Sequence, residues 1–387
     1  MGRKVVAITG RQGGTMVRRS RMVVGALLAA FVAGGEMANA SPFVDTKEGQ
    51  VQVDHMTLQE LQAAALTGSA DAQNRLGVVF LLGLGVKADF VKAFEWFQKA
   101  AEKGHPDAET WLGNLYGTGR GVTLDRQKSL FWTRKAAERG YSRAEYNLGV
   151  NFLEGTLTAT NYTEAIAWFR RAAEHGDVLA NHNLGLLLLT GRGTPSSPPN
   201  LRIEVDKVQA LKSIAFSAES GFADSQAALA AMYFEGNGVT QSYSEAARWY
   251  LLAAEQGSAY AQTMLSAMYL TGHGVTANQD TAVKWLKKAA ANGNAAAQEQ
   301  LGQSYGGGFY GLPQDFMQAI EWTTKAADQG NAEAQNTLGV AYLKGLGVPS
   351  EREVAHDWFK RAAAQGNAHA IYNIDKYFNK DKVFTGQ

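Results

Sequence analysis

Ala108–Gly140 reads A-E-T-W-L-G-N-L-Y-G-T-G-R-G-V-T-L-D-R-Q-K-S-L-F-W-T-R-K-A-A-E-R-G, and copies of this stretch fill most of the 387-residue chain. Its last glycine recurs at intervals of 36, 36, 36, 45, 36, 36, 37 and 36 residues, at Gly68, Gly104, Gly140, Gly176, Gly221, Gly257, Gly293, Gly330 and Gly366. Tryptophan keeps the same register at Trp96, Trp132, Trp168, Trp249, Trp285, Trp322 and Trp358, and Ser213 takes the one vacant place. A fixed period in this range indicates stacked pairs of helices.

Each copy contains the signals of two helices joined by a turn. Ala108, Leu112 and Tyr116 lie at i, i+4 and i+8, which puts them on one apolar stripe of a first helix. A glycine-rich turn follows, and Gly140 ends the second helix. The second helices are predicted to begin after residues whose side chains accept from free backbone N–H groups: Asp89, Asp125, Asn161, Asp206, Ser242, Asn278 and Asp315. One pair cannot complete its own core, so neighbouring pairs must stack into an all-α solenoid.

The consensus A-x3-L-G-x2-Y-x2-G-x-G-V-x2-D-x2-K-A-x2-W-x2-K-A-A-x2-G is similar to the Sel-one-like repeat (SLR) family, a relative of tetratricopeptide repeats. The resemblance covers Ala72 to Gly366 as eight repeats. It implies an α/α superhelix, a right-handed solenoid of antiparallel helix pairs that is used for protein–protein contact, in bacteria often in the envelope or at the host interface. We expect residues 69–366 to hold the repeats, 41–68 a linker and an N-terminal capping helix, and 367–387 a C-terminal capping helix and tail.

Residues 1–40 resemble an export signal. A basic region ends in Arg18-Arg19-Ser20-Arg21, an apolar run follows from Met22 to Ala33, and Ala38-Asn39-Ala40 precedes Ser41. We predict a signal peptide that is cleaved after Ala40, and hence an exported protein, periplasmic or secreted, with no integral membrane segment after cleavage. A later start codon, a twin-arginine route or an uncleaved amphipathic tail are the alternatives.

The composition excludes several functions. Lys+Arg is 37 and Asp+Glu is 36, and removing the six bases and one acid of residues 1–40 leaves 31 against 35, so no basic field predicts a nucleic-acid partner. Cys is 0, which excludes thiol chemistry and disulfides. The histidines have no metal-binding spacing, and no Walker or G-x-S-x-G pattern is present. The sequence therefore predicts no catalytic residue, no metal site and no cofactor.

From the sequence we expect a non-catalytic interaction scaffold or adaptor of the bacterial cell envelope. In related superhelices the first helices line the concave face, so side chains two positions before or after the repeated leucine are predicted to contact a peptide or protein partner. The candidates are Asn74, Thr110, Asn114, Tyr146, His182, Glu299, Gln303 and Asn336. A merely solvated inner surface is the plain alternative. A cell-wall-associated enzyme or glycan-binding protein is the alternative function.

Two turns depart from the repeat. The turn of repeat four gains nine residues (45 − 36) and contains Pro198 and Pro199, which are predicted to form a partner-binding loop or a hinge, or else a tolerated insertion. Repeat seven carries Gly306-Gly307-Gly308-Phe309-Tyr310-Gly311, where Phe309 and Tyr310 are predicted either to form an exposed tip or to fold back onto the helix ends. Its glycines match a dinucleotide fingerprint, but they follow a helix and not a strand.

Overall fold

The computed structural model describes residues 44–47, 50–53, 56–192 and 197–379. The predicted signal peptide and the tail after Asn379 lie outside these residues. The chain forms two compact units, Met1–Ala159 (unit 1) and Thr160–Gln387 (unit 2), and each is described by itself. In the part of the chain that the structure describes, no helix combines the length and the apolar character needed to cross a membrane.

Unit 1 begins with a small antiparallel sheet of strand order β1-β2-β3, formed by Val44–Lys47, Gln50–Val53 and Met56–Thr57. Val44 pairs with Val53, and Val53 pairs with Met56. The linker expected within residues 41–68 thus contains this sheet. The sheet leads into helix α2, Leu58–Leu66, whose N-cap Thr57 and residue Glu60 form a reciprocal capping box.

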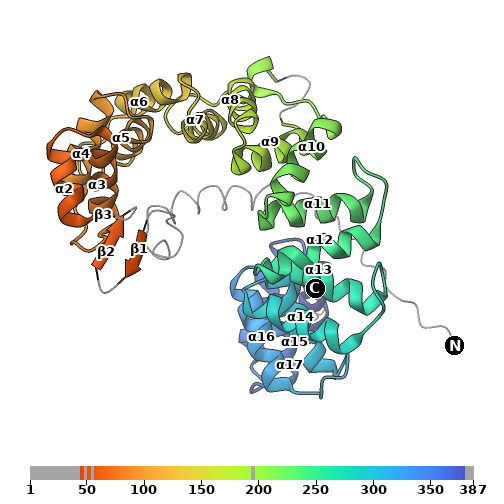
Figure 1. Ribbon diagram of the computed structural model, residues 1–387. Coiled ribbons are helices and arrows are strands. Elements are labelled where there is room, and N and C mark those ends of the chain that lie inside the picture. The colour runs from red at the N-terminus through yellow and green to blue at the C-terminus, as the bar shows by residue number, and fades with distance from the viewer. Residues whose placement is uncertain (1–43, 48–49, 54–55, 193–196, 380–387) are drawn as a thin grey trace, which may run out of the picture. The chain divides into compact units, whose positions relative to one another are not determined.

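The predicted helix pairs are present throughout the described repeats (Figure 1). The first helices are α3 Ala70–Leu82, α5 Pro106–Thr118, α7 Ser142–Glu154, α9 Val178–Thr190, α11 Ala223–Glu235, α13 Ala259–Thr271, α15 Ala295–Gly307 and α17 Ala332–Lys344, followed by α19 Ala368–Phe378. The second helices are α4 Phe90–Glu102, α6 Arg126–Glu138, α8 Tyr162–Glu174, α10 Lys207–Glu219, α12 Tyr243–Glu255, α14 Gln279–Ala291, α16 Phe316–Asp328 and α18 Arg352–Ala363. Within each unit, a second helix packs on the first helix of its own repeat and on that of the next.

The seven predicted N-caps of the second helices are confirmed, since each named side chain accepts a hydrogen bond from the first turn of its helix. Replacing such a cap with alanine costs about 1 kcal/mol. On α12, Glu245, three residues after the cap Ser242, pairs with Arg248 at 2.8 Å. The helix starts are therefore fixed by the predicted side chains acting as acceptors.

The centre of each helix pair is filled by the residue that follows the tryptophan position. These side chains are at most 2% exposed: Phe97, Thr133, Phe169, Ile214, Tyr250, Leu286, Thr323 and Phe359. The first helix approaches closely there, because a Cβ on Gly77 would lie 2.7 Å from the Phe97 ring and one on Gly339 would lie 2.6 Å from the Phe359 ring. The tryptophans flank this centre and are mostly half-buried, Trp249 excepted, so the repeated tryptophan is not the deepest residue of the core.

Repeat four keeps its second helix despite the insertion. Arg192 and Ile203 exchange two backbone hydrogen bonds, of 3.0 and 2.9 Å, that close the base of the loop. The turn η2, Pro199–Leu201, rests on α8, where Thr163 donates to the carbonyl of Pro199 at 3.3 Å. The boundary between the two units falls after Ala159, in repeat three, and not at this insertion.

Candidate partner-binding site

Half of the predicted contact residues are buried. Asn74, Thr110, His182 and Asn336 are 8%, 3%, 8% and 7% exposed. Partners on the next first helix cover two of them: Ser225 on α11 lies 2.7 Å from His182 Nδ1, and Asn373 on α19 donates to Asn336 at 2.9 Å. These four side chains are therefore largely covered in the free protein, and their contact with a partner stays a prediction.

The other four predicted residues are accessible. Asn114 and Tyr146 are half-buried on α5 and α7 of unit 1. On α15 of unit 2, Glu299 is half-buried and Gln303 is exposed. In unit 1, Figure 1 shows the first helices α3 and α5 in one row and the second helices α4 and α6 in another. The accessible candidates thus lie on the row of first helices in their respective units.

Sequence reasoning missed a buried polar position in every repeat, one residue after the stripe alanine or its serine equivalent in repeat five. An amide or a carboxylate stands there each time and is at most 7% exposed: Gln73, Glu109, Glu145, Asn181, Gln226, Gln262, Gln298 and Gln335. The signal was available, because a polar residue recurring beside a buried alanine must find a partner. On α19, the last helix of the described residues, the same position is Ile371, which is 51% exposed.

We call the hydrogen bonds of this buried amide or carboxylate to the neighbouring helices the polar joint. Its geometry is clearest at Gln262. Its Nε2 donates to the carbonyl of Ala254 in the last turn of α12 at 2.9 Å. Its Oε1 accepts from Asn292, the C-cap of α14, at 3.0 Å, and Asn292 also donates to the carbonyl of Gly257 at 3.4 Å. One amide pair therefore ties three consecutive helices, and the carbonyl of Ala254 in the last turn of α12 gains a buried side-chain donor. Gln226 with Gln256 repeats the arrangement.

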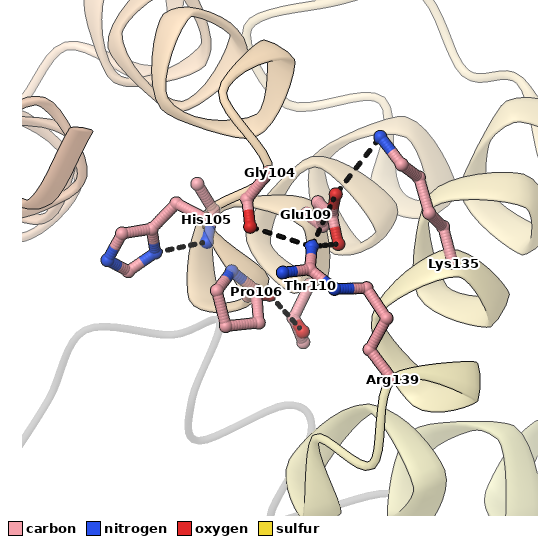
Figure 2. Close-up of polar contacts among 8 residues, drawn as sticks. Gly104, His105, Pro106, Glu109, Thr110, Lys135 and Arg139 are labelled. Atoms are coloured by element: carbon pink, nitrogen blue, oxygen red, sulfur yellow. Dashed lines mark hydrogen bonds and ion pairs between the residues drawn. The ribbon is translucent and has the colours of Figure 1, made fainter.

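Repeat two replaces the amide with a fully buried carboxylate (Figure 2). Glu109 lies 3.0 Å from Lys135 Nζ and 3.3 Å from Arg139 Nη1, and Arg139 also donates to the carbonyl of Gly104 at 2.7 Å. Figure 2 shows both cations reaching from α6 to the one carboxylate. A buried carboxylate needs such partners, because removing one leaves an uncompensated charge. Lys135 and Arg139 therefore both pair with Glu109 and hold α5 against α6.

Two of the predicted contact residues, His182 and Glu299, have displaced pKa values. Burial lowers the pKa of His182 from 6.5 to about 4, because the charged ring would lose its hydration. Burial raises the pKa of Glu299 from 4.5 to about 7, and the negative charge of Glu333 adds to the effect. His182 is thus neutral at pH 7, while Glu299 titrates near that pH.

The two irregular turns expose their predicted residues. Pro198 and Pro199 are exposed, and Pro195 lies outside the described residues. Phe309 is 56% and Tyr310 36% exposed, with ring centroids 6.4 Å apart. The Phe309 ring also lies against Gly307, where a Cβ would come within 2.2 Å. Tyr310 has φ = 56°, which is unusual for a bulky residue. Phe309 and Tyr310 are thus exposed, and the Phe309 ring also lies against the end of α15.

A cation covers the tryptophan of each second helix that has one. The charged group lies 4.1–4.7 Å from the ring centroid in the pairs Trp96–Lys99, Trp132–Lys135, Trp168–Arg171, Trp249–Arg248, Trp285–Lys288, Trp322–Lys325 and Trp358–Arg361. Such a contact contributes about 0.5–1 kcal/mol at an exposed site. A cation therefore lies over each of these rings, and the rings do not offer an uncovered face on which a ligand could stack.

The sequence matches the Sel1 repeat over residues 70–105, 106–141, 142–177, 178–200, 223–258, 259–294, 295–331 and 332–367. The fourth match stops inside the insertion, although α10 still forms. Comparison with curated proteins gives no match.

Two solved structures are similar over most of the chain. One is c5321, a protective antigen of uropathogenic Escherichia coli strains with an SLR fold: 34% identity, 82% of this chain and 66% of that one, TM-score 0.68. This chain thus spans just under two thirds of the length of c5321. The other is a Sel1 repeat protein from Oxalobacter formigenes: 32% identity, 82% of this chain and 90% of that one, TM-score 0.64. The eight matched repeats and the paired helices that fill them establish that the chain belongs to the Sel1 repeat family.

Proposed function

We propose that this protein is a non-catalytic interaction scaffold that holds a segment of a protein partner along a row of first helices. Sel1-repeat folds commonly mediate protein interactions and are generally non-catalytic. The observation that carries the proposal is that the polar side chains of the joint are buried and hydrogen-bonded, whereas the side chains beside them are accessible. Asn114 and Tyr146 remain accessible on helices whose mutual positions are set by buried amides and carboxylates.

The chemistry of these accessible residues suits a peptide. Amide groups can pair with a backbone in an extended conformation, and a tyrosine offers apolar area with a polar end. A rigid frame reduces the entropy that binding would cost, because little has to be ordered on association. We assign the peptide-binding surface of unit 1 to Asn114 and Tyr146 and that of unit 2 to Glu299 and Gln303.

We further propose that the protein acts outside the cytoplasm, in the bacterial cell envelope or beyond it. The support is the basic, apolar and small-residue order of residues 1–40. N-terminal sequencing of the exported protein tests this part, and an amino terminus far from Ser41 would contradict it.

Crosslinking in the native envelope, followed by mass spectrometry, would identify the partner. Titration calorimetry should then give an affinity that falls when Asn114→Ala and Tyr146→Ala are combined, while circular dichroism stays unchanged. Glu95→Ala, on the exposed side of α4, is the matched control and should bind like the wild type.

The same set of experiments also tests the alternative function, a glycan-binding protein. Carbohydrate sites usually present bare aromatic faces, and the second-helix tryptophans are covered by cations. Sedimentation with purified peptidoglycan, together with unchanged affinity of the double variant for the crosslinked protein, would replace the scaffold proposal with the alternative.

A further inference from the structure

The outward side of α6 carries an aromatic side chain where six of the other repeats carry a charged residue and one carries alanine. The residue before the tryptophan position is Glu95, Phe131, Ala167, Lys212, Arg248, Lys284, Glu321 and Asp357 in the eight repeats. Phe131 is 58% exposed, and its ring packs edge-on against Trp132 with centroids 5.3 Å apart. Because the position is solvated elsewhere, the core does not require an aromatic residue there.

A surface depression of about 380 Å³ lies beside this phenylalanine. The described residues that line it are Gln127, Leu130, Phe131, Arg134, Lys135 and Glu138, all on α6. Leu130 and Phe131 form its apolar middle, and charged groups lie toward its C-terminal end.

The charge of α6 indicates what the depression attracts. The helix carries Arg126, Lys128, Arg134 and Lys135 against Glu138, a sum of +3, and no other second helix exceeds the +2 of α14. Lys135 is committed to Glu109, and Lys128 lies 3.8 Å from Asp125. Among the residues that the structure describes, Arg134 has no ion-pair partner, and it borders the depression.

We propose that this face of α6 is a separate docking surface for an acidic peptide segment of a protein partner. An aliphatic or aromatic side chain of that segment rests on Leu130 and Phe131, and a carboxylate pairs with Arg134. Charge complementarity selects an acidic occupant. A duplex or a membrane needs a broad basic field, whereas unit 1 offers one helix with an acid, Glu138, in the depression itself. The surface is distinct from the first-helix row, so either site can fail without the other.

The probe is a fluorescein-labelled Glu-Glu-Asp-Leu-Phe-Glu-Glu peptide, measured by fluorescence anisotropy with the full chain. Binding should weaken about tenfold in Phe131→Glu and in Arg134→Glu, a change that corresponds to about 1.4 kcal/mol. Added NaCl should weaken it further. Phe131→Glu should fold normally, because Glu95 and Glu321 occupy the same place, and the thermal melt checks this. Glu95→Ala is the matched control in α4 and should bind like the wild type.

Four results would overturn the proposal. One is no binding of the glutamate peptide at millimolar concentration. The second is equal binding of a Lys-Lys-Lys-Leu-Phe-Lys-Lys peptide, which would remove the charge argument. The third is unchanged affinity in both α6 variants. The fourth is a wild-type dimer in sedimentation velocity that Phe131→Glu makes monomeric, which would assign the face to a second copy of the chain. The Asn114 and Tyr146 experiment is independent of all four.

Discussion

Replacing Glu299 with glutamine should remove a pH dependence of stability that this one carboxyl introduces. In the folded protein burial and the nearby charge of Glu333 raise its pKa from 4.5 to about 7. The folded state therefore binds the proton more tightly than the unfolded state. Its contribution to stability is fully present below pH 4.5 and is lost as the pH rises through about 7. The difference between the pKa values of the unfolded and folded states, 4.5 and about 7, corresponds to about 3 kcal/mol over the full range, and most of the loss falls between pH 5 and pH 8.

The assay is urea unfolding, followed by circular dichroism, of the wild type and Glu299→Gln at several pH values from 5 to 8. The difference in unfolding free energy, wild type minus variant, should fall by about 2.5 kcal/mol over this range. Glu95→Gln alters an exposed carboxyl of α4 and should run parallel to the wild type. A difference between wild type and Glu299→Gln that stays constant from pH 5 to pH 8 would refute the assignment.

Three further perturbations test other parts of the structure. His182, whose pKa is lowered to about 4 by burial, should lose about 2 kcal/mol of stability relative to an asparagine variant as the pH falls from 7 to 5, and parallel unfolding curves would exclude this. Arg139→Gln should cost about 1–2 kcal/mol in urea unfolding, because Arg139 is half exposed and Glu109 keeps Lys135 as a partner. Adding Glu109→Gln should recover most of this loss by recreating the amide pair of repeat five, and a double variant no better than the single one would count against the polar joint. Tyr310→Gly should raise the thermal midpoint, with a gain of about 1 kcal/mol from relieving positive φ, and a lower midpoint would mean that the aromatic contacts outweigh the backbone strain.

The sequence was sufficient for the helices, because their signals are local. A side-chain acceptor such as Asp89 begins a second helix through its own neighbours, and a periodic glycine ends it. The strand Gln50–Val53 was missed although its polar and apolar residues alternate, since the helical period dominated the interpretation.

The candidate site was predicted less well, and the reason is physical. Asn336 lies two positions before the stripe leucine Leu338, and Asn114 lies two positions after Leu112. When one helix is considered alone, both side chains therefore point outward. In the stack, Asn373 of the following first helix covers Asn336, while Asn114 stays accessible. Which of two such positions is covered depends on residues more than thirty positions away, and the period of a single repeat does not contain that information.

The polar joint was the larger omission. Gln262 and its partner Asn292 are separated by thirty residues, and neither forms a motif with its neighbours. Comparing equivalent positions across repeats would have found the pair, because a buried amide and a polar residue at the end of the second helix recur together.

The central claim is that a protein partner lies on a first-helix row, and photocrosslinking tests it most directly. A benzoylphenylalanine placed at Asn114 in unit 1 or at Gln303 in unit 2 should crosslink a protein in intact cells. The same group at the exposed Glu95 or Glu321 of the second helices should give no such adduct. Equal adducts from the second-helix positions, or none from either first-helix position, would contradict the claim.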